Sequence, residues 1–439
     1  MFTPLDDPSD LPRAYADAAR WEIPRSPLTF SEEVDVAIVG GGFLGISAAL
    51  HLAEAGVKAA VLEAKEIGSG GSGRALGQVV PYAKHDHRHI EAHYGPRAGG
   101  HLIDALAAGP DLVFGLIARH GIVCEAVRNG LIFAPHSAGE ERSLEAQAAY
   151  WCRNGAPVDF LKGDDASQII GSSYYPACLL DRRGGTVNPL AYVRGLARAA
   201  LAGGASLYTH TKAVAIEREG AGWRVKAREG ALLARSVIIG TGAYTDRLWP
   251  GLSRTIIPMR AHIRVSRPLS DNLRASVLPS GRSLTDTRRL YSGIRVRTDG
   301  RLQMSTDGPA FSLRGGPFVG KADRRVHQLF PQIGPLEWDE AWTGWVDMNS
   351  DFYPRIHEPA PGVWAALGLS GRGIAFATLL GRELAYRLSG HTEEMMLPVT
   401  QIRGIVARGM ARPLVGGLIQ AYRVLDCLEM ANYVRVSAN

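Results

Sequence analysis

A single glycine-rich turn constrains the fold of this 439-residue chain more than any other feature. Residues 34–39 form a short apolar run, rich in β-branched side chains and long enough for a buried strand of a parallel sheet. The run leads directly into the turn GGGFLG at 40–45, after which apolar residues recur at helical spacing. A second strand is expected over 57–62, and Glu63 follows it. A G-x-G-x-x-G between a strand and a helix is typical of dinucleotide-binding α/β folds.

Each glycine of this turn has its own expected role. Gly40 permits the tight turn, Gly42 lets the backbone approach a pyrophosphate, and Gly45 lets the helix pack closely on the strand. Glu63 is placed to accept both hydroxyls of an adenosine ribose, and its charge would repel a 2′-phosphate, which favours FAD or NAD over NADP. The predicted site also includes Phe43, Leu44, Ala64 and Lys65.

Three later segments favour FAD, because an isoalloxazine ring needs further loops to hold it. Residues 68–78 are rich in glycine and serine, and their N–H groups could form a nest for phosphate and ribitol oxygens. Residues 237–243 form a buried strand that ends in glycines, and residues 368–374 precede an apolar helix whose N-terminus would face the flavin N1–C2=O edge. The predicted cofactor residues here are Ser72, Gly73, Arg74, Gly77, Gln78, Thr241, Gly242, Gly371, Arg372, Gly373 and Ile374.

Composition and charge narrow the class of protein. Hydrophobic residues make up 46% and charged residues 21% of the chain, which excludes disorder and favours a soluble globular protein. We expect a cytoplasmic protein with no integral membrane segment, and the four scattered cysteines make a zinc cage or disulfide framework unexpected. Residues 254–325 hold 15 Lys and Arg but only 5 Asp and Glu. This segment either meets an anion or forms a solvated sheet face.

An ordered series of motifs over nearly the whole chain carries a resemblance to a known family. Beyond the 40–45 turn, the motifs are Tyr15 and Trp21, SGR at 72–74, RRGGTVNP at 182–189, TGAYTD at 241–246, WTGW at 342–345 and GRG at 371–373. The chain resembles the D-amino-acid oxidase-like superfamily of FAD-dependent amine oxidoreductases, most closely the group that includes gamma-glutamylputrescine oxidase. Ala75, Leu76 and Ser370 depart from the family pattern beside the expected flavin ring, which bears on the identity of the substrate.

The resemblance implies an α/β fold in which a discontinuous Rossmann-like FAD-binding domain carries an inserted antiparallel-sheet substrate domain. The FAD-binding domain is expected over 31–95, 184–250 and 355–400, and the substrate domain over a helical 96–183 and a strand-rich 255–350. Residues 401–439 are expected to form a C-terminal helical tail. The resemblance also implies a backbone contact from Ala213 to adenine, and the absence of cysteine near the flavin loops indicates non-covalent FAD.

The resemblance further implies oxidative deamination of a primary or N-substituted amine, by hydride transfer to flavin N5, hydrolysis of the imine, and reoxidation by O2. A gamma-glutamyl polyamine, an N-alkyl amino acid or an aminophosphonate would each supply an oxidisable C–N bond and an acidic group. Two alternatives remain: a flavin dehydrogenase that passes electrons to a quinone or protein acceptor, and an RNA-binding or tRNA-modifying flavoprotein. Because no aromatic-flanked basic cluster is present, no nucleic-acid partner is expected.

Candidate substrate residues lie mainly in two alternating runs. In 257–266, Arg260, His262 and Arg264 share one face and the apolar residues the other. In 291–297, Tyr291, Arg295 and Arg297 share one face. Arginine pairs well with carboxylate or phosphonate, so Arg264 or Arg295 is expected to anchor an acidic group, unless these are solvated residues. The further candidates are Tyr291, Trp342 and Trp345 as aromatic walls, and Gln78 and His262 as polar contacts.

Four histidines between 85 and 93 suggest a metal site at first sight. They lack an acidic or cysteine companion in a ligand pattern, and they directly follow the first flavin loop. If this segment is a strand, alternation places His85, His87 and His89 on one face. We interpret them as surface or site-lining residues and predict no metal site.

Overall fold

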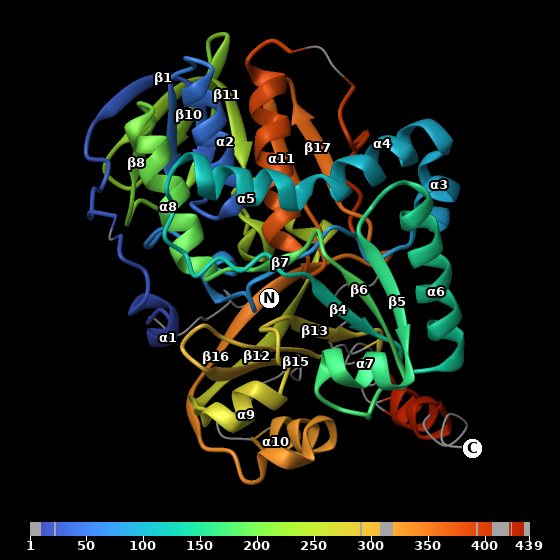
Figure 1. Ribbon diagram of the computed structural model, residues 1–439. Helices are drawn as coiled ribbons and strands as arrows, with labels where there is room; N and C mark the ends of the chain where they lie inside the picture. The colour runs from blue at the N-terminus through green and yellow to red at the C-terminus, as the bar shows by residue number, and fades with distance from the viewer. Residues whose placement is uncertain are drawn as a thin grey trace. The chain divides into compact units, whose positions relative to one another are not determined.

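The chain forms two compact units in the computed structural model (Figure 1), which describes residues 10–21, 23–289, 292–307, 319–391, 394–405, 421–422 and 424–433. Unit 1 comprises Met1–Cys124, Asn188–Met259 and Gly344–Val406. Unit 2 comprises Glu125–Val187, Arg260–Thr343 and Ala407–Asn439. Each unit is therefore assembled from three separate stretches of the chain.

Unit 1 is built on a largely parallel sheet, of which nine strands lie in the described residues. Five of them, in the order β18, β11, β1, β2 and β8, run parallel, and β17 joins the edge in antiparallel sense. The strands are β1 (Ser31–Val39), β2 (Ala59–Leu62), β8 (Ser206–Tyr208), β9 (Ala215–Glu219), β10 (Gly222–Lys226), β11 (Ala231–Ile239), β17 (Arg355–Ala360), β18 (Val363–Leu367) and β19 (Val399–Thr400). The parallel core agrees with the short, continuous apolar runs from which the strands are made.

Helices pack against this sheet and against one another (Figure 1). The central helix α2 (Phe43–Glu54) is buried over most of its length, because its sequence is apolar on nearly every side. It contacts α8 (Pro189–Ala202) and α11 (Gly373–Leu388), and the hairpin β9–β10 contributes Trp223 and Val225 to a core on the sheet. The remaining helices of unit 1 are α1 (Arg13–Ala16), α3 (His87–Tyr94), α4 (Pro96–Ala107) and α5 (Gly109–Arg119).

One apolar segment of the described chain, Pro96–Arg119, is long and apolar enough to cross a membrane by length and composition alone. It consists of the two helices α4 and α5, and α5 packs on α11 inside unit 1. Core helices of globular proteins meet the same criterion, so length and hydropathy alone do not identify a membrane span.

Unit 2 is built on a mostly antiparallel sheet in the order β16, β12, β15, β14, β13, β4, β6 and β5. Only the β13–β4 pair is parallel among the strand pairs described. The strands are β4 (Leu131–Ala134), β5 (Val158–Lys162), β6 (Ala177–Asp181), β12 (Ile257–Pro268), β13 (Ser283–Asp286), β14 (Gly293–Val296), β15 (Arg301–Asp307) and β16 (Trp338–Met348). The helices are α6 (Ala138–Arg153), α7 (Gly163–Ile170), α9 (Asp271–Ser276) and α10 (Val319–Leu329).

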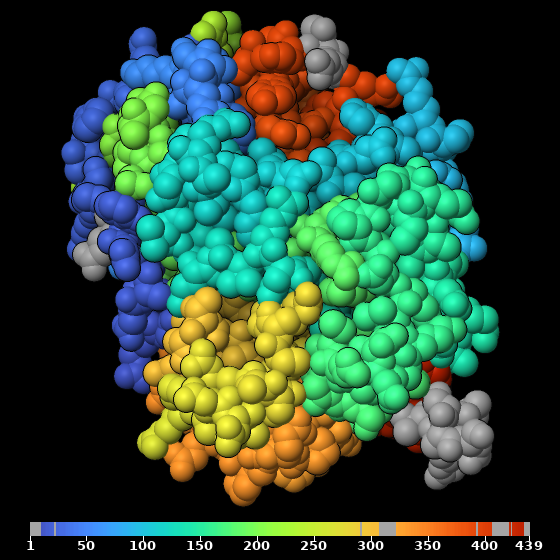
Figure 2. Space-filling model, viewed as in Figure 1, coloured from blue at the N-terminus to red at the C-terminus, as the bar shows by residue number. Residues whose placement is uncertain are grey.

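The core of unit 2 lies on the sheet face that α7 and α10 cover. Ile170 of α7 and Leu329 of α10 pack with the sheet residues Ile294 and Met304. Residues 424–433 are helical, and Tyr433 also reaches this core. Figure 2 shows α9 in yellow and α10 in orange at the surface of the unit.

The register of the sheet assigns the predicted arginines to its two faces. Directly opposed residues of an antiparallel pair share a face, and successive residues alternate between faces. Arg264 pairs with Met304, which pairs with Ile294, so Arg264 lies on the core face. Val265 pairs with Gln303, which pairs with Arg295, so Arg295 lies on the opposite face. Both faces contain fully buried residues, so neither is the solvated face that remained as an alternative.

The boundaries of the two units differ from the expected domain boundaries. Residues 96–124, expected in the substrate domain, belong to unit 1, because α5 packs on α11. The rest of the expected helical stretch also contains β4, β5 and β6. Short apolar runs such as LIFA in β4 do not distinguish a strand from a helix turn by periodicity.

Gly381 provides a test of the packing between α2 and α11. A Cβ at this position would collide with the Leu44 carbonyl and lie 2.7 Å from the Ser47 Cβ. Gly381→Ala should therefore cost about 1–3 kcal/mol by overpacking and lower Tm by about 2 °C or more. Gly115→Ala on α5 is the matched control, because its Cβ would meet open space. Its Tm should stay equal or rise, and an equal drop in both variants would contradict the packing assignment.

Candidate functional site

The glycine turn between β1 and α2 has no room for side chains at three of its glycines. Gly40 has φ +108°, and a Cβ on it would lie 2.7 Å from the Gly240 carbonyl oxygen. A Cβ on Gly45 would collide with the Gly40 carbonyl, and one on Gly42 would lie 2.9 Å from Ser72 Oγ. Gly42 precedes α2 without a side-chain cap, so backbone N–H groups form this helix N-terminus. Such a terminus suits a phosphate group.

Glu63 follows β2 and braces the same turn. Its Oε2 accepts a hydrogen bond from the Gly41 N–H at 2.7 Å, and its Oε1 accepts one from the Lys65 N–H at 2.9 Å. Burial raises the pKa of Glu63, although these two N–H groups act in the opposite direction. Ala64 and Lys65 are exposed beside it, and the buried Ala213 precedes the β9–β10 hairpin. The contacts to ribose and adenine stay predictions.

The first predicted flavin loop reaches the N-terminus of α2. Ser72 Oγ accepts a hydrogen bond from the Phe43 N–H at 3.0 Å. Arg74 is buried and donates from Nε to the Ser69 carbonyl at 2.9 Å, which closes the loop on itself. The hydroxyl of Tyr15, the first residue of the motif series, donates to the Ala75 carbonyl at 2.7 Å. Gly73, Gly77 and Gln78 complete the loop, with φ +99° at Gly77.

The second predicted loop meets the first. It follows β11, beside the turn after β1, and Gly242–Tyr244 form a short 3-10 helix. A Cβ on Gly70 would lie 3.0 Å from the Tyr244 ring, and Thr241 Oγ1 lies 2.7 Å from Thr245 Oγ1. The carboxyl ends of β1 and β11 therefore share one edge with the turn at 40–45, which is where ligands bind in open α/β sheets.

The third predicted loop joins β18 to α11. It contains two glycines with positive φ, Gly368 and Gly371, and the helix begins at Gly373 with Ile374 buried behind it. Arg372 donates to the Ala83 carbonyl, which ties the loop to the segment after the first flavin loop. Three glycine loops and the N-terminus of α2 thus lie in unit 1, and the space that the glycines leave is consistent with a dinucleotide.

Sequence reasoning missed Asp347, which lies under the third loop near the end of β16. Its Oδ2 accepts hydrogen bonds from the Gly368 N–H at 2.7 Å and the Leu369 N–H at 3.2 Å. Burial raises the pKa of Asp347 to about 6. The available signal was an acidic residue in the otherwise aromatic and apolar end of the WTGWVDM run.

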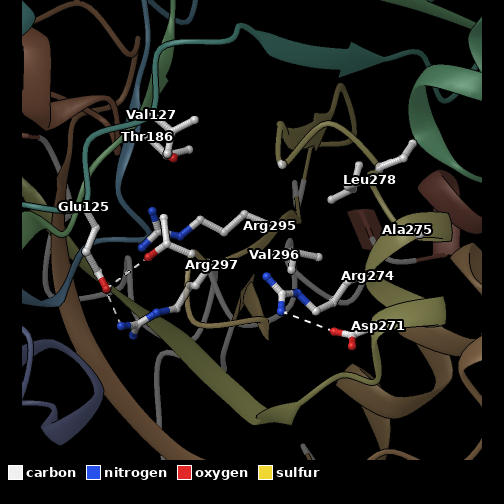
Figure 3. Close-up of a pocket in the computed structure, with 13 residues that line it drawn as sticks. Glu125, Val127, Thr186, Asp271, Arg274, Ala275, Leu278, Arg295, Val296 and Arg297 are labelled. Atoms are coloured by element: carbon white, nitrogen blue, oxygen red, sulfur yellow. Dashed lines mark hydrogen bonds and ion pairs between the residues drawn. The ribbon is translucent and has the colours of Figure 1, made fainter.

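Unit 2 contains a pocket of about 450 Å³ at the end of β14 (Figure 3). Arg295 and Arg297 line it and are only 4% and 5% exposed. Arg295 donates to Gln303 Oε1 at 3.0 Å and to the Val187 carbonyl at 2.9 Å. Arg297 lies 3.4 Å from Glu125, whose backbone has φ +51°. Arg274 of α9 lines another side and lies 3.6 Å from Asp271.

The other predicted substrate residues are distributed over both units. His262 and Arg264 are half-buried on the core-facing row of β12, and Arg264 lies 5.9 Å from the Trp338 ring centre. Trp342 is buried on β16 in unit 2, whereas Gln78 and Trp345 belong to unit 1. Tyr291 lies outside the described residues. Arg264 and Arg295 are therefore not brought together.

The histidine-rich segment is a helix, so the expected alternation on a strand is wrong. Asp86 caps α3 by accepting the His89 N–H at 2.9 Å. The rings of His85 and His93 stack on Tyr353, with centroids 4.1 and 4.0 Å away. This arrangement resembles an aromatic cluster more than a set of metal ligands.

A separate cluster in unit 2 has the composition of a metal site. His136 lies 2.9 Å from Glu429 and 3.9 Å from Asp426. Arg289 lies 2.8 Å from each of the two carboxylates. Its hydrogen bond to Glu429 is the main cause that lowers the pKa of Glu429 to about 2. A guanidinium lies against both carboxylates, so we interpret the cluster as an ion-pair network that holds the helix at 424–433.

The comparisons with known proteins identify the family of the chain. The chain matches the family model DAO, described as FAD dependent oxidoreductase, over residues 35–387. It is 30% identical over 382 residues to the gamma-glutamylputrescine oxidoreductase of Escherichia coli strain K12, covering 86% of this chain and 89% of that protein. It is 29% identical over 394 residues to the probable oxidoreductase OrdL of Haemophilus influenzae, covering 87% of this chain and 89% of that protein.

A solved structure supports the same assignment. The glycine oxidase of Geobacillus kaustophilus matches with a TM-score of 0.69 at 25% identity, covering 83% of this chain and 96% of that chain. The expected α/β fold and the expected FAD cofactor are thereby confirmed. On its motifs, its glycine cradle and these matches, the chain belongs to the DAO family of FAD-dependent oxidoreductases.

Proposed function

We propose that this FAD-dependent oxidoreductase oxidises the C–N bond of an amine that also carries an anionic group, with release of the imine to water and reoxidation by O2. The observation that carries the proposal is the meeting of the turn at 40–45 with the loops at 68–78 and 237–243 in one unit. The chemistry of the family then limits the substrate to an amine or amino acid.

The chain's own residues would bind and orient the cofactor. The N–H groups at the start of α2 would hold the pyrophosphate, and Glu63 would face the adenosine ribose. When bound, FAD supplies the acceptor for the hydride that leaves the amine-bearing carbon. The protein then has to orient the substrate and keep its amine neutral. Desolvation between apolar walls would lower the pKa of the amine and so favour its neutral form.

The anionic group is inferred from Arg295 and Arg297 in the unit 2 pocket. Both guanidiniums are buried, and a buried arginine binds a carboxylate by charge-assisted hydrogen bonds that are stronger than neutral ones. Two relatives are named for gamma-glutamylputrescine and glycine, and each compound combines an amine with a carboxylate. Arg264 is not retained as an anchor, because it lies on the opposite face of the sheet from Arg295.

A panel of amines tests the reaction class. Under anaerobic conditions, an amine with an acidic group should bleach the flavin absorbance, and matched amines without that group should bleach it at least tenfold more slowly. In air, the same reaction should release peroxide if O2 is the acceptor. Equal bleaching rates for acidic and neutral amines would remove the anionic group from the proposal, and bleaching without peroxide would favour a dehydrogenase.

Substitution of the pocket arginines tests the anchor. Arg295→Met should raise KM for an acidic amine about 10- to 100-fold, the loss expected for hydrogen bonds to a charged group, with little change for a neutral amine. Arg274→Met, at a half-exposed position of the same pocket, should raise KM less. Arg264→Met is the matched control and should leave KM unchanged. An equal effect of Arg264→Met and Arg295→Met would contradict the assignment.

The mode of cofactor attachment has a direct test. Precipitation of the yellow protein with acid or heat should release all the flavin into the supernatant, where its absorbance and mass identify it as FAD. The reason is that the loops around the cradle contain no cysteine. Flavin that stays with the pellet would show a covalent bond and contradict the prediction.

A further inference from the structure

Asp347 makes the side-chain hydrogen bonds that join the end of β16 to the glycine loop at 368–371. Only 8% of the residue is exposed, and one carboxylate oxygen accepts two successive backbone N–H groups, those of Gly368 and Leu369. The Asp347 carbonyl also accepts the Ser370 N–H at 3.1 Å. Side chain and backbone of one residue thus bind three consecutive amides of the loop.

The loop needs such support because its backbone is unfavourable for most residues. Gly368 and Gly371 have φ +81° and +83°, and Ser370 has φ +52°, a left-handed conformation that is costly for a residue with a Cβ. A Cβ on Gly368 would collide with the Asn349 side chain, two residues after Asp347 on the same stretch. The loop is therefore pressed against the end of β16 and held there by hydrogen bonds.

Among the described residues, no charged side chain contributes to the shifted pKa of Asp347. Burial is the main cause that raises its pKa, and the N–H groups of Leu369 and Gly368 act against it. The charged groups in the neighbouring stretch have other partners: Asp351 pairs with Arg355, and Arg372, at the far end of the loop, donates to the Ala83 carbonyl. The loop amides therefore stabilise the ionised carboxylate, and the carboxylate in turn holds the loop.

We propose that Asp347 is a positioning residue for FAD, whose ionised carboxylate holds the loop at 368–371 in the conformation that receives the flavin. The inference rests on the proposed role of this loop and deepens it, since Asp347 itself need not touch the cofactor. When the carboxyl group is protonated, it is a weaker acceptor for the two amides, so the loop loses part of its support.

The sign of the pH dependence follows from this difference. The ionised form of Asp347 supports the loop, so FAD binds the ionised protein more tightly and lowers the pKa of this group on binding. The dissociation constant of FAD should therefore be constant above about pH 7 and rise as pH falls through about 6. If the protonated form binds FAD very weakly, the constant rises about tenfold between pH 7 and pH 5.

The experiment measures the dissociation constant of FAD by flavin fluorescence on dilution of the holoenzyme, at several pH values from 5 to 8. The variants are Asp347→Asn, Asp347→Ala and, as the matched control, Asp104→Asn, which changes an exposed carboxylate of α4 in the same unit. The control should reproduce the parent profile. Asp347→Asn keeps an oxygen that can accept both amides, so it should bind FAD with a constant that no longer depends on pH in this range.

Asp347→Ala removes the acceptor and should raise the dissociation constant about tenfold or more at pH 7, without pH dependence. A parent-like profile in Asp347→Asn, or parent-like affinity in Asp347→Ala, would overturn the inference. If Asp347→Ala fails to fold, the profile of Asp347→Asn decides alone. A parent protein that binds no FAD at any pH would instead contradict the proposed function, so the two failures are distinguishable.

Discussion

The approach of two backbones at the carboxyl ends of β1 and β11 determines how unit 1 is built. The Gly40 and Gly240 turns lie so close that a single Cβ on Gly40 would come within 2.7 Å of a carbonyl oxygen. Any side chain there would separate the two central strands or move α2 away from the sheet. The same closeness brings the N-terminus of α2 to the edge where the other two predicted loops, at 68–78 and 368–374, also lie. The close packing of the strands thus also produces the surface that we expect to bind the pyrophosphate.

The parts of the molecule that follow from short stretches of sequence could be predicted, and those that depend on distant partners could not. The strand, turn and helix around Gly40 lie within about 30 residues, and their pattern is local. The face of Arg264 depends on Met304 on the next strand and Ile294 on the strand after it. Alternation alone therefore identified the neighbours of this arginine on its own strand but not the core beneath it. In the histidine-rich segment, Asp86 was a helix-capping signal that outweighed alternation.

The role of Asp347 could not be predicted from the sequence for a different reason. Its partners are backbone amides 21 residues further along the chain, and backbone amides leave no trace in a sequence. An isolated acidic residue in an apolar strand end is the only local sign, and the same sign often marks a residue at a solvent boundary. The predicted cofactor cradle thus has glycines that a motif reveals and, in our proposal, one supporting carboxylate that only the fold reveals.

Because each unit is assembled from distant stretches of the chain, the order of synthesis affects when its core can form. Unit 1 takes β17, β18 and α11 from a stretch that begins at Gly344, and Tyr433 completes the core of unit 2. Both cores therefore remain incomplete until the residues after Thr343 have been synthesised. A stop after residue 343 would remove β17, β18 and α11 from unit 1 and Tyr433 from the core of unit 2, so neither core would be complete.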